Sequence, residues 1–167
     1  MKKVLALTIF LSATILSLSA QEILIKFESS TGECGYLDCN KDTVIHTGSY
    51  KMCFTDTARY FATVFTHENR LIAIDSSQKE LFEVFRFDNG PDDISEGLFR
   101  IIKNGLIGFA NEKGEVVIHP RFKCAFPFKN GRAKVALECE KVSEREHTRL
   151  TSKKWFFIDR DGNKIKQ

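Results

Sequence analysis

Apolar and polar residues alternate along most of the chain, and the alternation follows a phrase that occurs four times. The phrase consists of apolar or aromatic residues, an Asp or Asn, a short polar turn and a closing β-branched or apolar segment. Alternation with a period of two, interrupted by a polar turn, predicts a β-hairpin. The four copies begin at Cys34, Leu71, Ile107 and Trp155.

The copies are regularly spaced, with starts 37, 36 and 48 residues apart. Near-equal periods of this length are typical of repeat proteins. Aromatic-rich connectors at 50–54 and 122–126 follow the first and third copies, and further strands are expected at 60–65, 97–102 and 132–137. Each unit is therefore predicted to contain a hairpin, a connector and a strand.

An isolated two-stranded unit cannot bury its apolar face in water, so neighbouring units must stack. We therefore expect an all-β fold of antiparallel β-meander repeats that form a curved sheet, a partly closed barrel or a propeller-like arc. A single domain over 21–167 is expected to contain units at about 32–68, 69–104, 105–152 and 153–167. The buried residues are expected to include Phe109, Ile118, Phe126, Phe157 and Ile158.

One polar residue occupies the same place in every copy, immediately before the turn. This column contains Asp38, Asp75, Asn111 and Asp159. Short Asp and Asn side chains at such positions accept hydrogen bonds from the backbone two residues further on. The column is therefore predicted to cap turns, with calcium or sugar coordination as the alternative.

Two polar segments interrupt the regular pattern. Residues 88–93 are acidic and rich in turn formers, which predicts a surface loop ahead of the strand at 97–102. Residues 138–153 account for the longer third spacing and are rich in Glu, Lys, Arg, Ser and Thr. We expect this insertion to form an extended hairpin or a mobile loop, and insertions in repeat arrays often mark the side that meets a partner.

The third unit carries the most complete motif of the four. It reads Gly108-Phe109, Gly114, Val116-Val117-Ile118 and Pro120, and continues through Phe122 to Phe126-Pro127-Phe128 and Gly131. This pattern resembles the bacterial WG-repeat family, also called KWG repeats. The Trp-Gly pair itself is nowhere intact, because Phe156 follows Trp155 and Gln78 replaces the turn glycine of the second unit. The resemblance implies a β-rich repeat array and supplies no common catalytic residues.

The N-terminus has the pattern of a secretory signal peptide. Lys2 and Lys3 precede an apolar run of about 15 residues, and Ser19-Ala20 supply small residues at its end. The run is shorter than the ~20 residues of a spanning helix. Residues 1–20 are therefore predicted to be removed after Ala20, with a cut after Ser19 or an uncleaved anchor as alternatives. We expect a secreted or periplasmic protein whose mature chain has no membrane span.

Charge and composition narrow the partner class. Without residues 1–20, 23 Lys and Arg face 22 Asp and Glu, a net charge of +1. Nucleic-acid binding requires clustered positive potential, so no nucleic-acid partner is expected. The chain contains 15 Phe, of which 14 follow the predicted leader and are expected mainly in the core.

Five cysteines follow the predicted leader, at positions 34, 39, 53, 124 and 139. An exported chain meets an oxidising compartment, in which thiols pair, and an odd number leaves at least one free. Cys34 and Cys39 flank the first turn region and are a candidate disulfide. A zinc site formed by Cys34, Cys39, His46 and Cys53 is the alternative, although its spacing lacks a C-x-x-C pair.

The sequence contains no recognisable catalytic, cofactor-binding or metal-binding constellation. A thiol hydrolase would need a Cys held beside a His such as His46 or His119, but both histidines only follow the closing Ile of a repeat. We therefore expect a non-enzymatic module that binds a protein or a cell-envelope component. The alternative is a carbohydrate or small-ligand site that uses an exposed aromatic residue, Trp155 or Tyr50.

Overall fold

The structure is a computed structural model that describes residues 23–144 and 147–166. The predicted signal peptide at 1–20 lies outside the described residues. Strands are the only regular elements of the described ranges, and all of their pairings are antiparallel. The expected all-β class is confirmed. No helix of a length and apolarity that could span a membrane occurs in the part of the chain that the structure describes.

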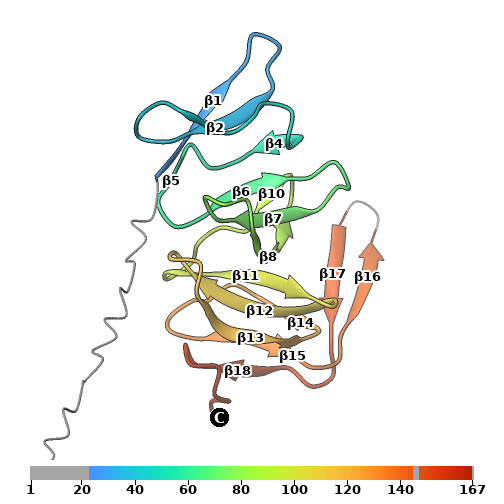
Figure 1. Ribbon diagram of the computed structural model, residues 1–167. Helices are drawn as coiled ribbons and strands as arrows, with labels where there is room; N and C mark the ends of the chain where they lie inside the picture. Colours follow the sequence, from blue (N-terminus) through green and yellow to red (C-terminus); the bar gives the residue numbers. More distant parts are fainter. Residues whose placement is uncertain (1–22, 145–146, 167) are drawn as a thin grey trace, which may run out of the picture.

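Four successive meanders form the body of the molecule (Figure 1). The first three have three strands each, and in the fourth the third strand is reduced to a bridge between Ile158 and Lys164. The strands are β1 (Leu24–Glu28), β2 (Cys34–Leu37) and β3 (Thr43–Ile45); β6 (Ala62–Phe65), β7 (Leu71–Ile74) and β8 (Glu80–Val84); β11 (Leu98–Lys103), β12 (Leu106–Asn111) and β13 (Val116–Phe122); and β15 (Ala133–Ala136) with β18 (Phe156–Ile158).

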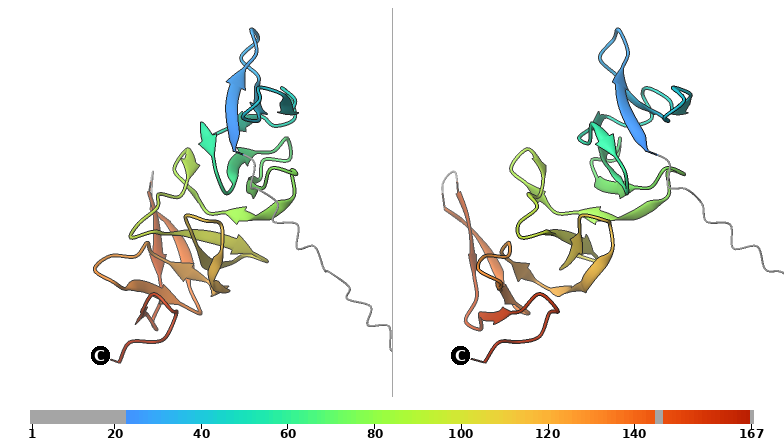
Figure 2. Two further views of the ribbon diagram at one scale, coloured as in Figure 1. Left: turned by 60° about the vertical axis from the view of Figure 1, so that its left-hand side comes forward. Right: turned by 90° about the vertical axis from the view of Figure 1, so that its left-hand side faces the viewer.

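Short strands occupy the connectors between meanders. They are β4 (Met52–Cys53), β5 (Thr57–Ala58), β9 (Arg86–Phe87), β10 (Gly90–Pro91) and β14 (Cys124–Ala125). The β8–β11 pairing joins the second and third meanders into one seven-stranded sheet of order β13-β12-β11-β8-β7-β6-β4. None of the sheets closes on itself within the described residues, so the array is curved and open (Figure 2).

The insertion at 138–153 forms a hairpin, the first of the two outcomes expected for it. Its strands are β16 (Glu140–Glu144) and β17 (His147–Thr151), which pair with each other and project from the side of the array (Figures 1 and 2). The hairpin stands where the other meanders have a tight turn between their first two strands. The fourth meander therefore differs from the others by extension of a turn.

The core lies between neighbouring meanders. Successive side chains of a strand point to opposite faces, so a strand of an inner meander can contribute to two interfaces. In β7, Ile72 and Ile74 pack toward the first meander, whereas Leu71 and Ala73 pack toward the third. Each meander is thus stabilised by its nearest neighbours, as in other repeat proteins.

This arrangement explains which core predictions hold. Phe109, Ile118 and Ile158 are buried, as expected, but the predictions for Phe126 and Phe157 are wrong, because Phe126 is 39% exposed and Phe157 is only partly buried. Phe157 is the repeat equivalent of Tyr36, Ala73 and Phe109. Those three residues are fully buried against the following meander. No further meander follows Phe157 in the described chain.

The predicted turn caps are present in all four units. In each, one side-chain oxygen accepts the backbone N–H groups two and four residues further on, at 2.8–3.0 Å. The residue three positions after the cap has positive φ in every unit, at Lys41, Gln78, Gly114 and Gly162. The capping prediction is therefore confirmed, and only two of these left-handed positions keep glycine.

The glycine of the degenerate Trp-Gly pair has a packing role. At Gly108, an added Cβ would lie 2.4 Å from the Ile118 carbonyl oxygen and 2.5 Å from the Pro120 nitrogen. At Gly35, it would lie 2.5 Å from the Ile45 carbonyl oxygen. The register between the second and third strands shifts across Gly108 in the third meander and between Tyr36 and Leu37, just after Gly35, in the first. A side chain at either position would collide with the backbone of the third strand.

The predicted Cys34–Cys39 disulfide is wrong. Cys34 pairs with Cys53 and Cys124 pairs with Cys139, whereas Cys39 is free and exposed. Cys34 is the first residue of β2 and Cys39 lies in the turn two residues beyond its end, and the strand itself extends roughly 10 Å, more than a disulfide spans. Cys34–Cys53 instead ties the first meander to the β4 connector, and Cys124–Cys139 ties β14 to the base of the inserted hairpin.

Candidate functional site

One equivalent position in the first strand of each meander carries a positively charged side chain at both ends of the array. The residue at this position pairs with the middle residue of the following repeat phrase. In the order of the meanders, the residues are Lys26, Thr63, Arg100 and Lys134. In the last three, the backbone carbonyl also accepts the N–H of a connector phenylalanine at 2.9 Å; these are Phe54, Phe85 and Phe126. Backbone pairing therefore makes Arg100 and Lys134 equivalent residues of the third and fourth units.

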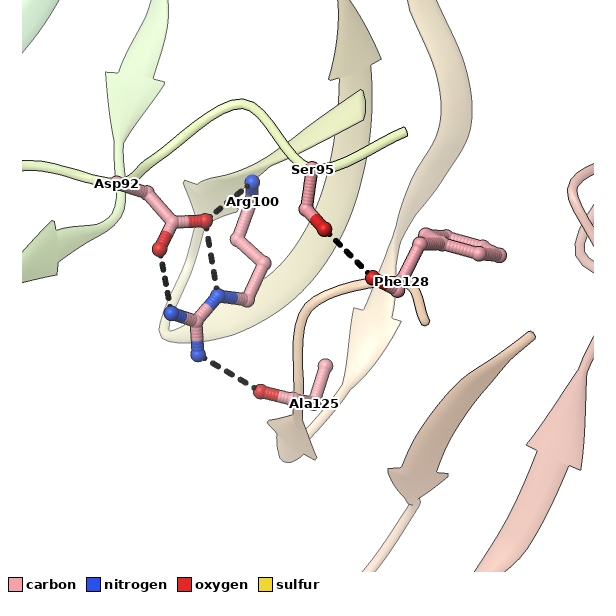
Figure 3. A network of polar contacts seen from close by, with 5 residues as sticks. All are labelled: Asp92, Ser95, Arg100, Ala125 and Phe128. Carbon is pink, nitrogen blue, oxygen red and sulfur yellow. Dashed lines mark hydrogen bonds and ion pairs between the residues drawn. The ribbon is translucent and has the colours of Figure 1, made fainter. Parts of the chain in front are cut away.

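In the third unit this position is filled by a buried ion pair (Figure 3). Asp92 Oδ2 accepts the Arg100 backbone N–H and Nε–H, each at 2.9 Å, and Asp92 Oδ1 pairs with Arg100 Nη2. Arg100 Nη1 donates to the Ala125 carbonyl at 3.0 Å, and the guanidinium lies 4.0 Å from the centroid of the Phe85 ring. Each charge is therefore compensated inside the protein, as burial requires.

Asp92 belongs to the segment that sequence reasoning placed in a surface loop, and for this residue that prediction is wrong. Asp92 is 7% exposed. The available signal was Arg100 itself, a charge inside the apolar run Leu98-Phe99-Arg100-Ile101-Ile102. Because an unpaired buried charge is very costly, such an arginine predicts an acidic partner nearby.

The fourth unit has the same backbone arrangement without the acid. Lys134 Nζ lies 5.0 Å from the centroid of the Trp155 ring system and 6.0 Å from that of Phe126. Fifteen positions separate Phe85 from Arg100, but only eight separate Phe126 from Lys134. The shorter connector lacks the residues that carry Asp92 in the third unit, so Lys134 remains exposed.

A second cation lies two residues before Lys134, immediately ahead of β15. Arg132 is exposed, and its guanidinium carbon lies 4.6 Å from the centroid of Phe157. The corresponding residues of the inner units, Phe61 and Leu98, are apolar. The structure pairs neither Arg132 nor Lys134 with a carboxylate among the residues it describes.

These side chains form one surface at the end of the array, which we call the terminal face. It consists of Phe126, Arg132, Lys134, Trp155 and Phe157. Trp155 and Phe126 have ring centroids 5.4 Å apart with their planes inclined at 50°. Ala133, Val135 and Ile158 point the opposite way into the core shared with the third meander. The terminal face is thus the outward side of a sheet whose inner side is buried.

The base of the inserted hairpin borders the terminal face. Cys139 is bonded to Cys124, two residues before Phe126, and Lys154 immediately precedes Trp155. Trp155 also borders a surface cavity of about 360 Å³, lined by Leu137, Glu138, Lys154, Phe156 and Lys164. The disulfide therefore fixes the position of the hairpin base relative to the rings of Phe126 and Trp155.

The structure places the two predicted ligand-contact aromatics far apart in the array. Trp155 is on the terminal face, whereas Tyr50 packs against the core between the first two meanders. Burial raises the pKa of Tyr50. Tyr36 lies in the same core, where its hydroxyl donates to the Thr55 carbonyl at 2.9 Å and burial raises its pKa.

The thiol and histidine candidates do not form a shared site. Four of the five cysteines are in disulfides, which leaves Cys39 as the one thiol. His119 lines a surface cavity of about 500 Å³ together with Arg70, Glu80 and Glu83, and no cysteine lines that cavity. In residues 23–144 and 147–166 no cluster of three or more His, Cys, Asp or Glu could hold a metal ion.

The stacked antiparallel meanders, together with the equivalent strand pairings of successive units, define an all-β repeat protein. The family model for the WG containing repeat matches residues 107–138, which run from the second strand of the third meander into the fourth. This match covers one degenerate copy and supports the resemblance of the third unit to the WG-repeat family. No curated protein and no solved structure matches the chain.

Proposed function

We propose that the protein is an exported, non-enzymatic binding module and that the terminal face is its binding surface. The observation that carries the proposal is the partial exposure, at the end of the array, of positions that the inner units bury. Trp155 and Phe157 correspond to Ile107 and Phe109, which pack against the next meander. Aromatic residues and arginine are enriched at the energetic centres of protein interfaces.

The proposed partner is a protein or a component of the cell envelope. Support for export comes from the sequence pattern of residues 1–20 and from two disulfides, which persist in oxidising compartments. Support for a macromolecular partner comes from the form of the terminal face, a sheet surface with rings and cations. A small-molecule site is more often a concave pocket.

Retention of envelope components tests the proposal. The mature protein is immobilised and exposed to an envelope extract, in parallel with the Trp155→Ala and Phe126→Ala variants. Phe87→Ala is the matched control, because Phe87 is also an exposed phenylalanine, at 58%, but lies in the connector between the second and third meanders. We expect both terminal-face variants to lose a component that the wild type and the control retain. Equal retention by all four proteins would contradict the proposal.

A carbohydrate or small ligand beside Trp155 is the second candidate, favoured by the cavity of about 360 Å³ that this residue borders. Trp155 is the only tryptophan in the chain, so its fluorescence reports directly on that cavity. Saturable changes on addition of a glycan panel would favour this candidate. Emission that does not respond to the glycans, together with loss of retention in the variants above, would favour the macromolecular partner.

A further inference from the structure

We propose that the terminal face binds an acidic peptide segment of a partner protein, whose carboxylates meet Lys134 and Arg132. The inference rests on the proposed function and names the chemistry of the partner. Its basis is the third unit, in which the fold itself fills the position equivalent to Lys134. There Arg100 receives the carboxylate of Asp92 from a connector segment and lies over the Phe85 ring.

The fourth unit retains three parts of that arrangement. The strand position is the same, the connector phenylalanine Phe126 makes the same backbone hydrogen bond, and a cation lies over aromatic rings. The carboxylate is the part that the short connector does not provide. A carboxylate from another molecule can reach Lys134 because the side chain is exposed, whereas Arg100 is only 4% exposed.

The spacing of the two cations specifies the segment further. Arg132 immediately precedes β15 and lies two residues before Lys134, and side chains at this interval along an extended chain lie on one face, roughly 7 Å apart. An extended partner segment with acidic residues at alternate positions has the same interval. Phe157 lies beneath Arg132, Trp155 and Phe126 lie beside Lys134, and these rings offer contact area to apolar side chains that flank the acids.

Charge complementarity favours a peptide over other occupants. The net charge after removal of residues 1–20 is only +1, so the protein as a whole attracts anionic surfaces weakly. The positive charge of the terminal face is limited to two side chains placed over rings. Such a site suits a short segment with matched acids better than an extended anionic membrane, which favours clusters of about four to eight basic residues.

The test uses the mature protein and a fluorescein-labelled peptide, Thr-Phe-Asp-Val-Asp-Phe-Thr, whose binding is followed by fluorescence anisotropy. An analogue with Asn in place of both Asp is the control peptide. We expect saturable binding of the acidic peptide and weaker binding of the neutral analogue. Lys134→Gln and Arg132→Gln should each weaken binding of the acidic peptide about two- to fivefold, the range of an exposed charge pair. Lys134→Arg should retain binding.

Lys113→Gln is the matched protein control, because Lys113 is an exposed lysine in the turn of the third unit. Equal binding of the two peptides, unchanged binding by both Gln variants, or no saturation up to about 1 mM peptide would overturn the proposal. Lys134-dependent binding to anionic vesicles without peptide binding, or Lys134-dependent self-association, would overturn it in favour of a membrane or a second copy. Loss of the retained envelope component in Trp155→Ala but not in Lys134→Gln would overturn this inference alone and leave the proposed function standing.

Discussion

Lys134 occupies in the fourth meander the position that Arg100 occupies in the third. Both residues pair with the middle residue of the next repeat phrase, and both accept a backbone N–H from a connector phenylalanine. Their surroundings differ because the connector before Arg100 is longer and supplies Asp92. The same repeat position is therefore buried in an ion pair in one unit and exposed to solvent in the next.

The Asp92–Arg100 pair should be a major determinant of stability. Asp92→Ala leaves the Arg100 guanidinium buried without its carboxylate, so we expect the free energy of unfolding to fall by about 3–5 kcal/mol. Urea denaturation followed by circular dichroism measures the change. The double variant Asp92→Leu, Arg100→Met should be less destabilised than Asp92→Ala, because no buried charge remains.

A surface pair provides the control for this measurement. Lys154 and Glu138 lie 3.6 Å apart, with both side chains more than three-quarters exposed. Glu138→Gln should change the free energy of unfolding by less than about 1 kcal/mol. If Asp92→Ala cost no more than Glu138→Gln, the buried network of Figure 3 would not have the role assigned to it.

Gly108 should not tolerate a side chain. Gly108→Ala places a methyl group against the backbone at Ile118 and Pro120, so we expect a loss of about 1–3 kcal/mol or more from overpacking. Gly90→Ala is the matched control, since its nearest new contact is a Phe54 ring carbon at 3.8 Å. Thermal denaturation of the two variants measures the difference, and similar midpoints would contradict the proposed close approach.

The disulfide arrangement predicts a single reactive cysteine in the native protein. Iodoacetamide should label Cys39 without reductant, and peptide mass mapping should find Cys34 joined to Cys53 and Cys124 joined to Cys139. Cys53→Ser should lower the free energy of unfolding by about 2–4 kcal/mol, whereas Cys39→Ser should leave it nearly unchanged. A peptide containing Cys34 linked to Cys39 would contradict the structure.

The turn carboxylates predict a component of acid lability. Burial opposes ionisation of Asp75, but hydrogen bonds from Ser77 Oγ and from the backbone N–H groups of Lys79 and Ser77 lower its pKa. A lowered folded-state pKa contributes stability above the unfolded-state pKa of about 3.9, and that contribution is lost as the pH falls through the folded-state pKa.

Asp75→Asn tests this contribution with the turn retained, because Asn111 accepts the same two backbone hydrogen bonds in the third unit. The free energy of unfolding is measured in urea from about pH 6 down to about pH 2.5. We expect the variant to lose less stability than the wild type on acidification. Identical pH dependence of the two proteins would show that the Asp75 carboxylate is not stabilised in the folded state.

Sequence reasoning predicted the features that are set by local rules. The caps at Asp38, Asp75, Asn111 and Asp159 follow from backbone hydrogen bonding within five residues, and the repeat period indicated stacked meanders. The features that sequence reasoning missed depend on which surfaces of a unit are covered by its neighbouring units. Phe126 and Phe157 look like core residues in the pattern, but no further meander covers them in the part of the chain that the structure describes. Cys53 is the partner of Cys34 because the β4 connector folds back against β2, which sequence separation does not reveal.

The candidate site was predicted only in part. Trp155 was predicted as an exposed aromatic residue that contacts a ligand, but Arg132 and Lys134 were not singled out, because isolated basic residues are usually solvated. Their significance appears when the units are compared in space, since Leu98 and Arg100 show what the same positions do when they are covered. The repeat register identified equivalent positions in the four units, and the structure showed which of these positions lie at the exposed end of the array.

Site-specific photo-crosslinking in cells that produce the protein tests the central claim most directly. A photoreactive phenylalanine analogue is placed at Phe126 on the terminal face and, separately, at Phe87 in the connector, two positions that both expose an aromatic ring. The account predicts a discrete adduct with a partner protein from position 126 and none from position 87. An adduct from position 87 with none from position 126 would contradict the assignment of the terminal face as the binding surface.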